Sequence, residues 1–564
     1  MSNGESRHVF RILIRNFINS LKPRQIQGNQ IGKDYIGNEY FEIPADPSRG
    51  KRKPSRWYDP PKGQDFQDPI PAEWEAWLRM RRTEPPTEEE IAKNLAIAEM
   101  KKVNAEKLEA QRLAEGGSLP AACFFRRIHR YVMEVFTFTN KNLYKHLRHF
   151  RNYENLLMSQ ANKLSSKEIF ALEDKYGCRN YAPLTVALCR GEGVFVWDVE
   201  GKKYFDFLSA YSAVNQGHCH PRIVKALKDQ ADVLTLVSRA FYSDQLGKYE
   251  KFMTDLLGYD RLLPMNTGVE GGESACKIAR KWGYDVKKIP SDQAKIIFAE
   301  GNFWGRTLSA VSSSSDPTCY TGFGPYMPCF ELIPYNDIPA LEKALQDPTV
   351  AAFMVEPIQG EAGVIIPDDG YLRKVRELCT KYNVLWIADE VQTGLGRTGK
   401  LLAVQHEGVK PDILILGKAL SGGILPVSAV LANNNVMDVI KPGTHGSTYG
   451  GNPLACAVAT EAIKVLLEEK LCENAERLCK IFREELEKIP KSKVVTIRGR
   501  GLMFAIDVHS SIPAYDVCLK LKEAGLLAKP THGQTIRLAP PLVITEEQIR
   551  FGAKIIQTVF ESYQ

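Results

Sequence analysis

The sequence predicts an α/β protein with a mostly parallel central sheet, a smaller C-terminal α+β domain and a small, partly irregular N-terminal module. Apolar, β-rich runs alternate with helical patterns at Lys295–Ala299, Ala351–Val355, Val384–Ala388 and Ile413–Leu416. Strands of a parallel sheet covered by helices on both faces have this uninterrupted apolar character. From about Glu468 the helix and strand patterns mix differently, which indicates a separate α+β domain. The regular alternation begins only near Lys163.

Length and composition agree with a globular protein of several domains. The chain has 564 residues, enough for roughly three or four units of about 150 residues each. With 44% hydrophobic and 25% charged residues, it can bury a large core. The net charge is +7, and much of the excess precedes residue 155. We find no basic helix with interleaved aromatic residues and no nucleic-acid motif, so we expect no nucleic-acid partner.

The lengths of the apolar runs and the spacing of the cysteines argue against a membrane span and a metal site. No run of about 18 apolar residues occurs, so we expect no membrane span. The twelve cysteines are scattered without Cys-x-x-Cys spacing, so we expect free thiols, a reducing compartment and no metal site. The triplet His218-Cys219-His220 does not change this expectation, because neighbouring residues of a strand point to opposite faces.

The first region, residues 1–117, predicts a small module. Its expected elements are an amphipathic stretch at Arg7–Arg24, a turn and alternating strand at Gly37–Pro44, an irregular stretch at Asp46–Pro61, a helix from Pro71 and a charged helix from Thr87 through Leu113. The amphipathic stretch is acid-poor and is either a mitochondrial address or a first helix. The helix from Pro71 places Trp74 and Trp77 on one face, as core or docking residues. Thr87 and Glu90 have capping-box spacing.

This region resembles the mimitin-like family of small accessory subunits and assembly factors of respiratory complex I. The resemblance rests on the turn Gly37–Phe41, the box Pro71–Leu78 and the run Pro85–Glu90, and covers about residues 7–105. It implies a mitochondrial, non-enzymatic role in complex I assembly. Residues 118–162, which are basic, aromatic and nearly acid-free, are interpreted as a basic linker or the junction of two fused coding regions.

Three features of the third region carry chemistry. Gly268 and the glycines after it open a helical pattern, which suits a phosphate but also a plain capped helix. Asp389 ends an apolar strand, where α/β sheets collect ligand groups. Lys418 ends another apolar strand, where burial would favour the neutral amine that a Schiff-base lysine requires. The glycines of 394–399 fit neither a P-loop nor a dinucleotide fingerprint, because Leu401 follows the lysine and five residues separate the strand from the glycines.

Together these features predict a pyridoxal-phosphate site. The cofactor needs a phosphate anchor, a carboxylate at its ring nitrogen and a lysine amine, and the three occur here in that order. Residues 170–560 resemble the class III aminotransferases of the fold-type I pyridoxal-phosphate superfamily, and within them the ornithine aminotransferases. The resemblance is carried by Asp206–His218, Met265–Glu270 and His445–Pro453. Gly271 and Leu425 stand where the family often has alanine and an aromatic residue.

The resemblance implies roles at the cofactor. Lys418 would bind it covalently and move the proton, Asp389 would pair with the ring nitrogen, and Gln392 would hydrogen-bond the ring hydroxyl. Phe303 and Val391 would pack on the two ring faces. The phosphate would be held by Gly268, Val269 and Thr448. Thr448 would come from the neighbouring subunit, so the enzyme would be at least a homodimer.

The resemblance also implies how the substrates, ornithine and 2-oxoglutarate, are bound. Arg306 would grip the α-carboxylate of ornithine, with Tyr181 and Tyr211 lining the pocket. Arg537 would grip the α-carboxylate of 2-oxoglutarate or glutamate. Glu361 would neutralise Arg537 while ornithine reacts, so that the δ-amine rather than the α-amine is transferred.

Two alternatives stay open from the sequence. The chain is another ω-aminotransferase, acting on acetylornithine or 4-aminobutyrate, or it is primarily a mitochondrial complex I assembly protein with a fused transferase. The expected organisation is an assembly-factor-like module (1–117), the linker or junction (118–162), an N-terminal segment with the large cofactor domain (163–467) and a small C-terminal domain (468–564). We expect the mitochondrial matrix as its location, or the cytosol if the transferase is made separately.

Overall fold

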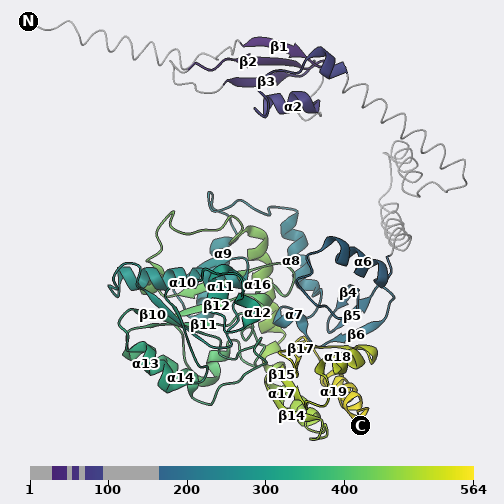
Figure 1. Ribbon diagram of the computed structural model, residues 1–564, viewed down its shortest axis with the longest axis vertical. Helices are drawn as coiled ribbons and strands as arrows, with labels where there is room; N and C mark the ends of the chain where they lie inside the picture. Colours follow the sequence, from purple (N-terminus) through teal and green to yellow (C-terminus); the bar gives the residue numbers. More distant parts are fainter. Residues whose placement is uncertain (1–27, 47–53, 62–69, 93–163, 564) are drawn as a thin grey trace, which may run out of the picture. The chain divides into compact units, whose positions relative to one another are not determined.

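The computed structural model of the protein describes residues 28–46, 54–61, 70–92 and 164–563 (Figure 1). The chain divides into two compact units, Met1–Tyr153 and Glu154–Gln564. The predictions for Arg7–Arg24, for residues 118–162 and for the charged helix beyond Ala92 lie outside the described residues.

The N-terminal unit contains a three-stranded antiparallel sheet and one helix. Its elements are β1 (Asn29–Lys33), β2 (Glu39–Ile43), β3 (Ser55–Asp59) and α2 (Ala72–Leu78). The predicted turn before β2 is confirmed, since Asp34 Oδ1 accepts the N–H groups of Ile36, Gly37 and Asn38. The prediction of an irregular stretch is wrong for β3. Its residues Trp57 and Tyr58 pair across from the aromatic residues of β2, and this pairing outweighs the turn-forming residues around it.

Aromatic side chains form the core of this unit. The ring of Tyr40 stacks on Trp74 with centroids 3.9 Å apart, and Trp77 meets Trp74 edge-on. Arg56 covers the outer face of Trp77, 4.4 Å from its centroid. Its guanidinium also donates to the carbonyl oxygens of Trp77 and Thr83. Both predicted tryptophans are therefore core residues, each 1% exposed.

We expect Trp74→Ala to unfold the N-terminal unit without destabilising residues 164–563. Removing a fully buried tryptophan costs about 3–5 kcal/mol, which is comparable with the whole stability of so small a unit. Calorimetry of the full chain should lose one transition and keep the other. Tyr35→Ala is the control, because Tyr35 is 51% exposed. A joint loss of both transitions in the Trp74 variant would show that the units unfold together.

A seven-stranded sheet forms the centre of the larger unit. Its strands follow the order β7 (Arg261–Met265), β13 (Ser428–Ala432), β12 (Ile413–Leu416), β11 (Leu385–Asp389), β10 (Val350–Val355), β8 (Lys295–Ala299) and β9 (Phe330–Ile333). Only β13 runs against the others, so the predicted mostly parallel sheet is confirmed. The predicted strands agree with β8 and β12 and are shifted by one residue at an end of β10 and at both ends of β11.

Helices cover both faces of this sheet. Along β11, Leu385 and Ile387 join the core beneath α10, while Trp386 and Ala388 join the core on the opposite face. This alternation explains why all five residues of the strand are buried. The helices of this part of the chain are α8 (Pro221–Ala231), α9 (Leu246–Leu257), α10 (Gly268–Asp285), α11 (Leu308–Ser312), α12 (Pro317–Tyr320), α13 (Ile338–Leu345), α14 (Tyr371–Lys381), α15 (Asn434–Met437) and α16 (Pro453–Glu468), with the 3-10 helices η2 (Ala403–Glu407) and η3 (Lys418–Ser421).

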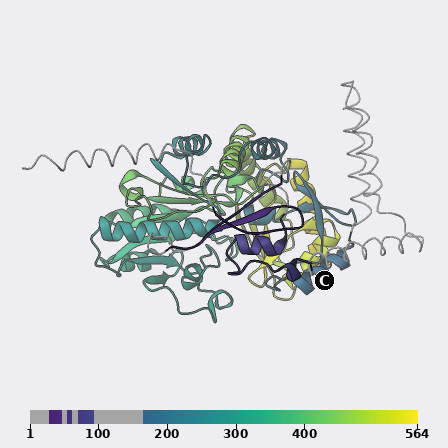
Figure 2. The same cartoon turned by 90° about the horizontal axis from the view of Figure 1, so that it is seen from above.

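The C-terminal part of the chain forms the predicted α+β arrangement. Figures 1 and 2 show its yellow elements gathered on one side of the central sheet. An antiparallel sheet β14 (Val494–Arg500), β15 (Met503–Val508), β18 (Thr535–Leu538), β17 (Lys529–Thr531) packs with α17 (Leu471–Leu486), α18 (Ala514–Glu523) and α19 (Glu546–Glu561).

A second small sheet joins the two ends of the larger unit. It contains β16 (Leu526–Leu527), β6 (Lys203–Asp206), β5 (Phe195–Asp198) and β4 (Leu188–Glu192), in that order across the sheet. Helix α6 (Ser166–Tyr176) precedes the strands β4, β5 and β6 in the chain. The N-terminal strands thus share a sheet with the C-terminal segment, although the predicted bounds group them with the large domain.

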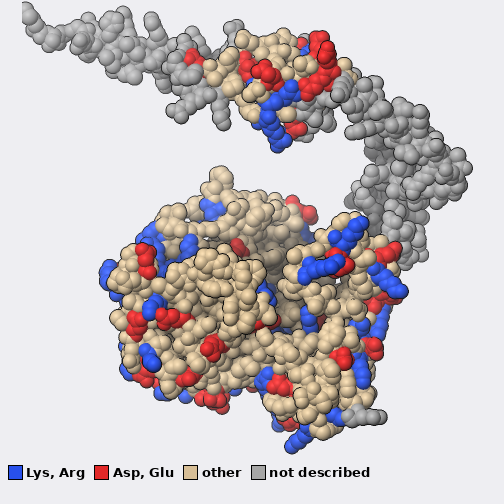
Figure 3. All heavy atoms as spheres, in the orientation of Figure 1, with Lys and Arg blue, Asp and Glu red and all other residues tan. Residues whose placement is uncertain are grey.

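Basic and acidic side chains are interspersed on the face seen in Figure 3. Within the parts of the chain that the structure describes, no helix is long and apolar enough to cross a membrane.

Candidate active site

The parallel strands bring the predicted chemical groups to one edge of the central sheet. Asp389 is the last residue of β11, and Lys418 follows the neighbouring strand β12 after a single glycine. Gly268 follows β7, and Glu356 follows β10 directly. Because the carboxyl ends of parallel strands share an edge, residues far apart in sequence meet here.

The N-terminus of α10 offers free backbone donors. Thr267 and Glu270 form a capping box, in which Glu270 N donates to Thr267 Oγ1 and Thr267 N donates to Glu270 Oε2. The cap leaves the N–H groups of Gly268 and Val269 without an acceptor among the described residues, at the positive end of an 18-residue helix. A Cβ at position 268 would lie 2.9 Å from Val391 Cγ1, so glycine permits a close approach here. This geometry suits a phosphate group.

Two buried carboxylates lie behind this helix end. Asp389 is 5% exposed and its Oδ1 accepts one hydrogen bond, from Val391 N at 3.0 Å. Burial raises the pKa of Asp389 to about 6, against the lowering effects of this hydrogen bond and of Lys418. Burial, with the charge of Asp389, raises the pKa of Glu356 to about 8. Glu356 accepts the N–H groups of Phe303 and Gly360, so it ties together the loops that follow β8 and β10.

Lys418 sits in a strained position beside these carboxylates. Its φ of +43° lies in the left-handed region, which is rare for a residue with a side chain. Such strain persists where the surroundings determine the conformation, often at functional sites. Burial lowers the pKa of Lys418, while Asp389 acts in the opposite direction. The neutral, nucleophilic amine is therefore more accessible than in a solvated lysine. A Cβ at Gly417 would lie 3.2 Å from Val391 Cγ1, so Val391 packs between the lysine strand and α10.

Arg537, on β18, is a buried cation. It is 1% exposed, and burial lowers its pKa to about 10. Its Nη1 donates to Gln392 Oε1 at 2.6 Å and its Nη2 to Ser212 Oγ at 3.0 Å, while Nε has no partner among the described residues. Glu361, expected to neutralise Arg537 while ornithine reacts, acts on the guanidinium through its charge, although no carboxylate among the described residues lies within 4.0 Å of Arg537. Gln392, the predicted partner of the ring hydroxyl, uses its Oε1 to accept from Arg537.

A left-handed turn, α7 (Ser209–Ser212), contacts Arg537 through the hydroxyl of its last residue, Ser212. Its four residues have φ of 49°, 46°, 60° and 74°, and none is glycine. A left-handed conformation costs roughly 1–2 kcal/mol per residue, so the turn is strained. The turn places the centroid of the Tyr211 ring 5.7 Å from the guanidinium carbon of Arg537. Sequence reasoning found Tyr211 by resemblance only and missed Ser212, because no glycine marks the turn.

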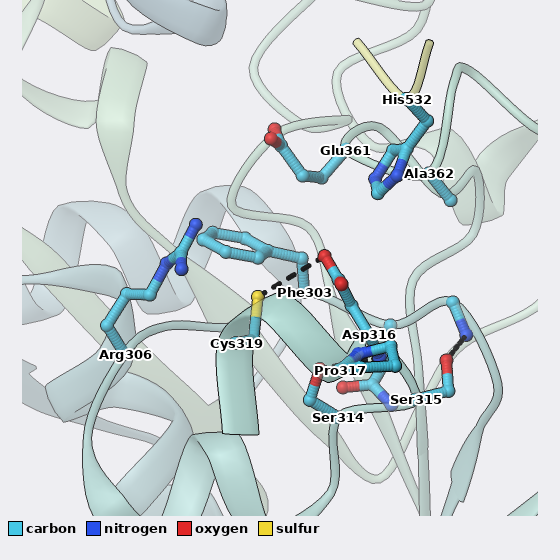
Figure 4. Close-up of a pocket in the computed structure, with 12 residues that line it drawn as sticks. Phe303, Arg306, Ser314, Ser315, Asp316, Pro317, Cys319, Glu361, Ala362 and His532 are labelled. Carbon is cyan, nitrogen blue, oxygen red and sulfur yellow. Dashed lines mark hydrogen bonds between the residues drawn. The ribbon is translucent and has the colours of Figure 1, made fainter. Parts of the chain in front are cut away.

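A cavity of about 360 Å³ is lined by two of the predicted substrate-binding residues, Arg306 and Glu361 (Figure 4). Its walls include Phe303, Arg306 and Glu361, and also Asp316 and His532, which sequence reasoning missed. Figure 4 shows Arg306 beside the Phe303 ring, and its guanidinium carbon lies 5.4 Å from the ring centroid. A cation and an anion thus face one cavity, as an amino acid would require.

Two predicted residues are open to solvent within the single chain, although Tyr181 lies near enough to Tyr211 to add to the effect of burial in raising the pKa of Tyr211. Tyr181 is 77% exposed and Thr448 is also exposed. The loop that carries Thr448 is tied to α10 through His445, which hydrogen-bonds Ser274 and Lys277. His218 and His220 pair with different carboxylates, Asp206 and Glu469, so they do not converge on one point.

One further buried residue escaped sequence reasoning. Arg397, in the glycine-rich stretch that matches no nucleotide motif, is 0% exposed. It donates to the carbonyl oxygens of Leu502 and Pro540 and to Asn215 Oδ1. The stretch therefore anchors the C-terminal segment to the active-site side of the sheet.

Comparison with known proteins agrees with this arrangement. Residues 176–560 match the family model for class-III aminotransferases, and residues 28–115 match that of NADH ubiquinone oxidoreductase subunit NDUFA12, which confirms both predicted resemblances. The mitochondrial ornithine aminotransferase of Drosophila melanogaster is 69% identical over 392 residues, 70% of this chain and 91% of the relative.

Solved structures agree as well. An ornithine aminotransferase from Toxoplasma gondii, with partial occupancy of PLP at its active site, is 53% identical with a TM-score of 0.70, over 73% of this chain and 97% of that one. The acetylornithine aminotransferase of Elizabethkingia anophelis is 57% identical with a TM-score of 0.65, over 71% and 100%. Since the family match spans most of the sequence and includes the residues at the sheet edge, the chain belongs to the class-III aminotransferases.

Proposed function

We propose that the protein is an ornithine δ-aminotransferase that uses pyridoxal 5'-phosphate to convert L-ornithine and 2-oxoglutarate into glutamate 5-semialdehyde and L-glutamate. The observation that carries the proposal is that Arg306 and Glu361 line the same cavity, beside the edge of the central sheet that carries Asp389 and Lys418. High identity to the Drosophila ornithine aminotransferase supports the same donor.

The residues at the sheet edge fit the cofactor. Gly268 and Val269 offer to its phosphate two N–H groups that have no acceptor among the described residues, and Asp389 retains a carboxylate oxygen for its ring nitrogen. Phe303 and Val391 would pack on its ring. Lys418 would hold the cofactor, and its neutral Nζ would take up the proton that the substrate carbon loses. When bound, the cofactor supplies an electron sink for the carbon that loses a proton.

Charge placement supports the choice of ornithine. Arg306 would bind the α-carboxylate as a bidentate pair, and the δ-amine would then point toward Lys418. Tyr211 would line the inner part of the site, and Tyr181 would close the outer part once its exposed ring is covered. We propose a homodimer, or a higher oligomer, in which Thr448 of each subunit completes the phosphate site of the other. Gln392 would reach the ring hydroxyl through the amide nitrogen that Arg537 leaves free.

The second substrate would bind at Arg537. This guanidinium is buried with two neutral acceptors, so it can accept a carboxylate without first breaking an ion pair. The charge of Glu361 stabilises the cation from a distance and would repel the α-carboxylate of ornithine from it. This arrangement would keep the two carboxylate subsites, at Arg306 and Arg537, in use at different steps.

We expect Glu361→Ala to permit transfer of the α-amino group of ornithine. Loss of the negative charge leaves Arg537 attractive to the wrong end of the substrate, so the product should include the α-keto acid. Mass spectrometry of the products would measure the ratio of α- to δ-transfer. Glu361→Gln is the matched variant, since it keeps size and loses charge. Unchanged regiospecificity in both variants would refute the proposed role of Glu361 in keeping the α-carboxylate of ornithine away from Arg537.

The proposed reaction is tested by a product assay. The full chain, loaded with pyridoxal phosphate, is mixed with ornithine and 2-oxoglutarate, and the expected products are glutamate and the cyclised semialdehyde, pyrroline-5-carboxylate. Acetylornithine is the second candidate donor, because the Elizabethkingia acetylornithine aminotransferase shares 57% identity. Faster turnover of acetylornithine or 4-aminobutyrate than of ornithine would replace the proposed donor.

The N-terminal unit supports a second proposed role. Its match to a complex I subunit family points to association with complex I assembly intermediates. Both this match and the mitochondrial ornithine aminotransferases among the relatives support a location in the mitochondrial matrix. Immunoprecipitation of the full-length chain from mitochondria should recover complex I subunits. Recovery of none would refute this role, and two shorter native products on a blot would show that the two halves are made separately.

A further inference from the structure

Arg537 is oriented by neutral oxygen atoms rather than by a carboxylate. Ser212 Oγ accepts from Nη2 at 3.0 Å, and Gln392 Oε1 accepts from Nη1 at 2.6 Å. The guanidinium is planar, so two acceptors on two different nitrogens define both its position and its plane. Ser212 is 1% exposed, which excludes water as a ready substitute for its hydroxyl group.

Ser212 reaches Arg537 because of the left-handed turn that ends at it. Its φ is +74°, and three non-glycine residues with positive φ precede it. A right-handed turn at the same place would direct the side chain elsewhere. Ala213 N donates to Ser209 O at 2.9 Å, which closes the turn.

Asp206 and His218 lock the entrance of this turn. Asp206 Oδ1 accepts Leu208 N at 2.8 Å and Ser209 N at 2.9 Å. Its other oxygen, Oδ2, lies 2.7 Å from His218 Nε2. The carboxylate is thus bound on both sides, and its partners hold the strained backbone against relaxation.

We infer that Ser212 is a positioning residue that presents Arg537 to the carboxylate of the amino acceptor, and that the Asp206–His218 pair acts through the turn to keep Ser212 in place. The inference rests on the proposed function only in that Arg537 binds a dicarboxylate. It assigns to the Ser212 hydroxyl a role in the acceptor half of the reaction and none in the donor half, because this hydroxyl contacts Arg537 and Ser212 does not line the donor cavity.

The test compares Ser212→Ala with Ser209→Ala. Ser209 lies in the same turn and is 0% exposed, and its hydroxyl oxygen has no hydrogen-bond partner in the part of the chain that the structure describes, so it is a matched control. The probe is glutarate, an unreactive dicarboxylate, titrated into the cofactor-loaded full chain by calorimetry. Losing one hydrogen bond to a charged group should raise the Kd of glutarate about tenfold in Ser212→Ala, with no change in Ser209→Ala. The rate of the ornithine half-reaction should stay the same in both variants.

Four results would discriminate. Equal Kd values for glutarate in both variants and the wild type would overturn the inference, and so would a parallel loss of the ornithine half-reaction in Ser212→Ala. As a second variant, Asp206→Asn keeps an oxygen for the two N–H groups and weakens the His218 contact; it should raise the Kd of glutarate in the same direction, and no rise would remove the Asp206–His218 pair from the inference. Absence of ornithine turnover with the Kd values still separated would refute the proposed donor and support the inference.

Discussion

Lys418→Ala should abolish transamination, with kcat falling by about 10⁴-fold or more. Lys418 is the only described lysine at the Asp389 edge of the sheet, and burial lowers its pKa so that a neutral amine is available to react. Loss of the side chain removes both the group that would bind the cofactor covalently and the group that would move the proton. Single-turnover kinetics with ornithine, and the absorbance of the bound cofactor, would measure the two losses separately.

Lys287→Ala is the matched control for this experiment. Burial lowers the pKa of Lys287 as it does that of Lys418, but Lys287 donates to the carbonyl oxygens of Val350 and Tyr382, at the opposite end of β10. It should keep full activity per folded molecule. Addition of a small primary amine should restore part of the proton transfer in Lys418→Ala and none in a variant that is merely unfolded. Wild-type turnover in Lys418→Ala would refute the assigned site.

Asp389→Asn should reduce kcat by about 10³-fold and weaken cofactor binding. Asparagine keeps an oxygen to accept Val391 N, so the loop after β11 should stay in place. It loses the negative charge that would hold a proton on the ring nitrogen. Glu390→Gln is the matched control, because Glu390 is an equally buried neighbour whose oxygens accept Thr393 Oγ1 and Val404 N. That variant should lose stability and keep the cofactor.

The Asp389 prediction has a pH signature. Burial raises the pKa of Asp389 to about 6, so in the empty site the carboxylate is ionised above that pH and protonated below it. Cofactor affinity of the wild type should therefore fall as the pH drops through about 6, while the Asn variant should bind weakly at every pH. Fluorescence titration of the cofactor at several pH values measures this. An identical pH profile in the two proteins would rule out Asp389 as the group that binds the ring nitrogen.

The sequence alone was sufficient to predict the strands of the central sheet and the order of the chemical groups at their ends. Strands such as Ile413–Leu416 are apolar throughout because both of their faces are buried, and this is visible in one dimension. Asp389 and Lys418 stand at strand ends, so their shared edge follows from the parallel topology. The spacing of the tryptophans of α2 predicts core or docking residues on one face, and their burial decides for the core. The strand β3 is not predicted, because its pairing with β2 is not local.

Only the tertiary structure decided how Arg537 is held and how the cavity is walled. The turn Ser209–Ser212 contains no glycine, and its left-handed backbone is imposed by Asp206 and by contacts with distant segments, so no local signal reveals it. Ser212 and Gln392 meet Arg537 from positions more than a hundred residues away in sequence. Asp316 and His532 likewise reach one cavity from separate elements. Residue type and spacing therefore determined which groups serve the chemistry, while long-range packing determined which of them touch, because contacts between distant segments form only when the chain is folded.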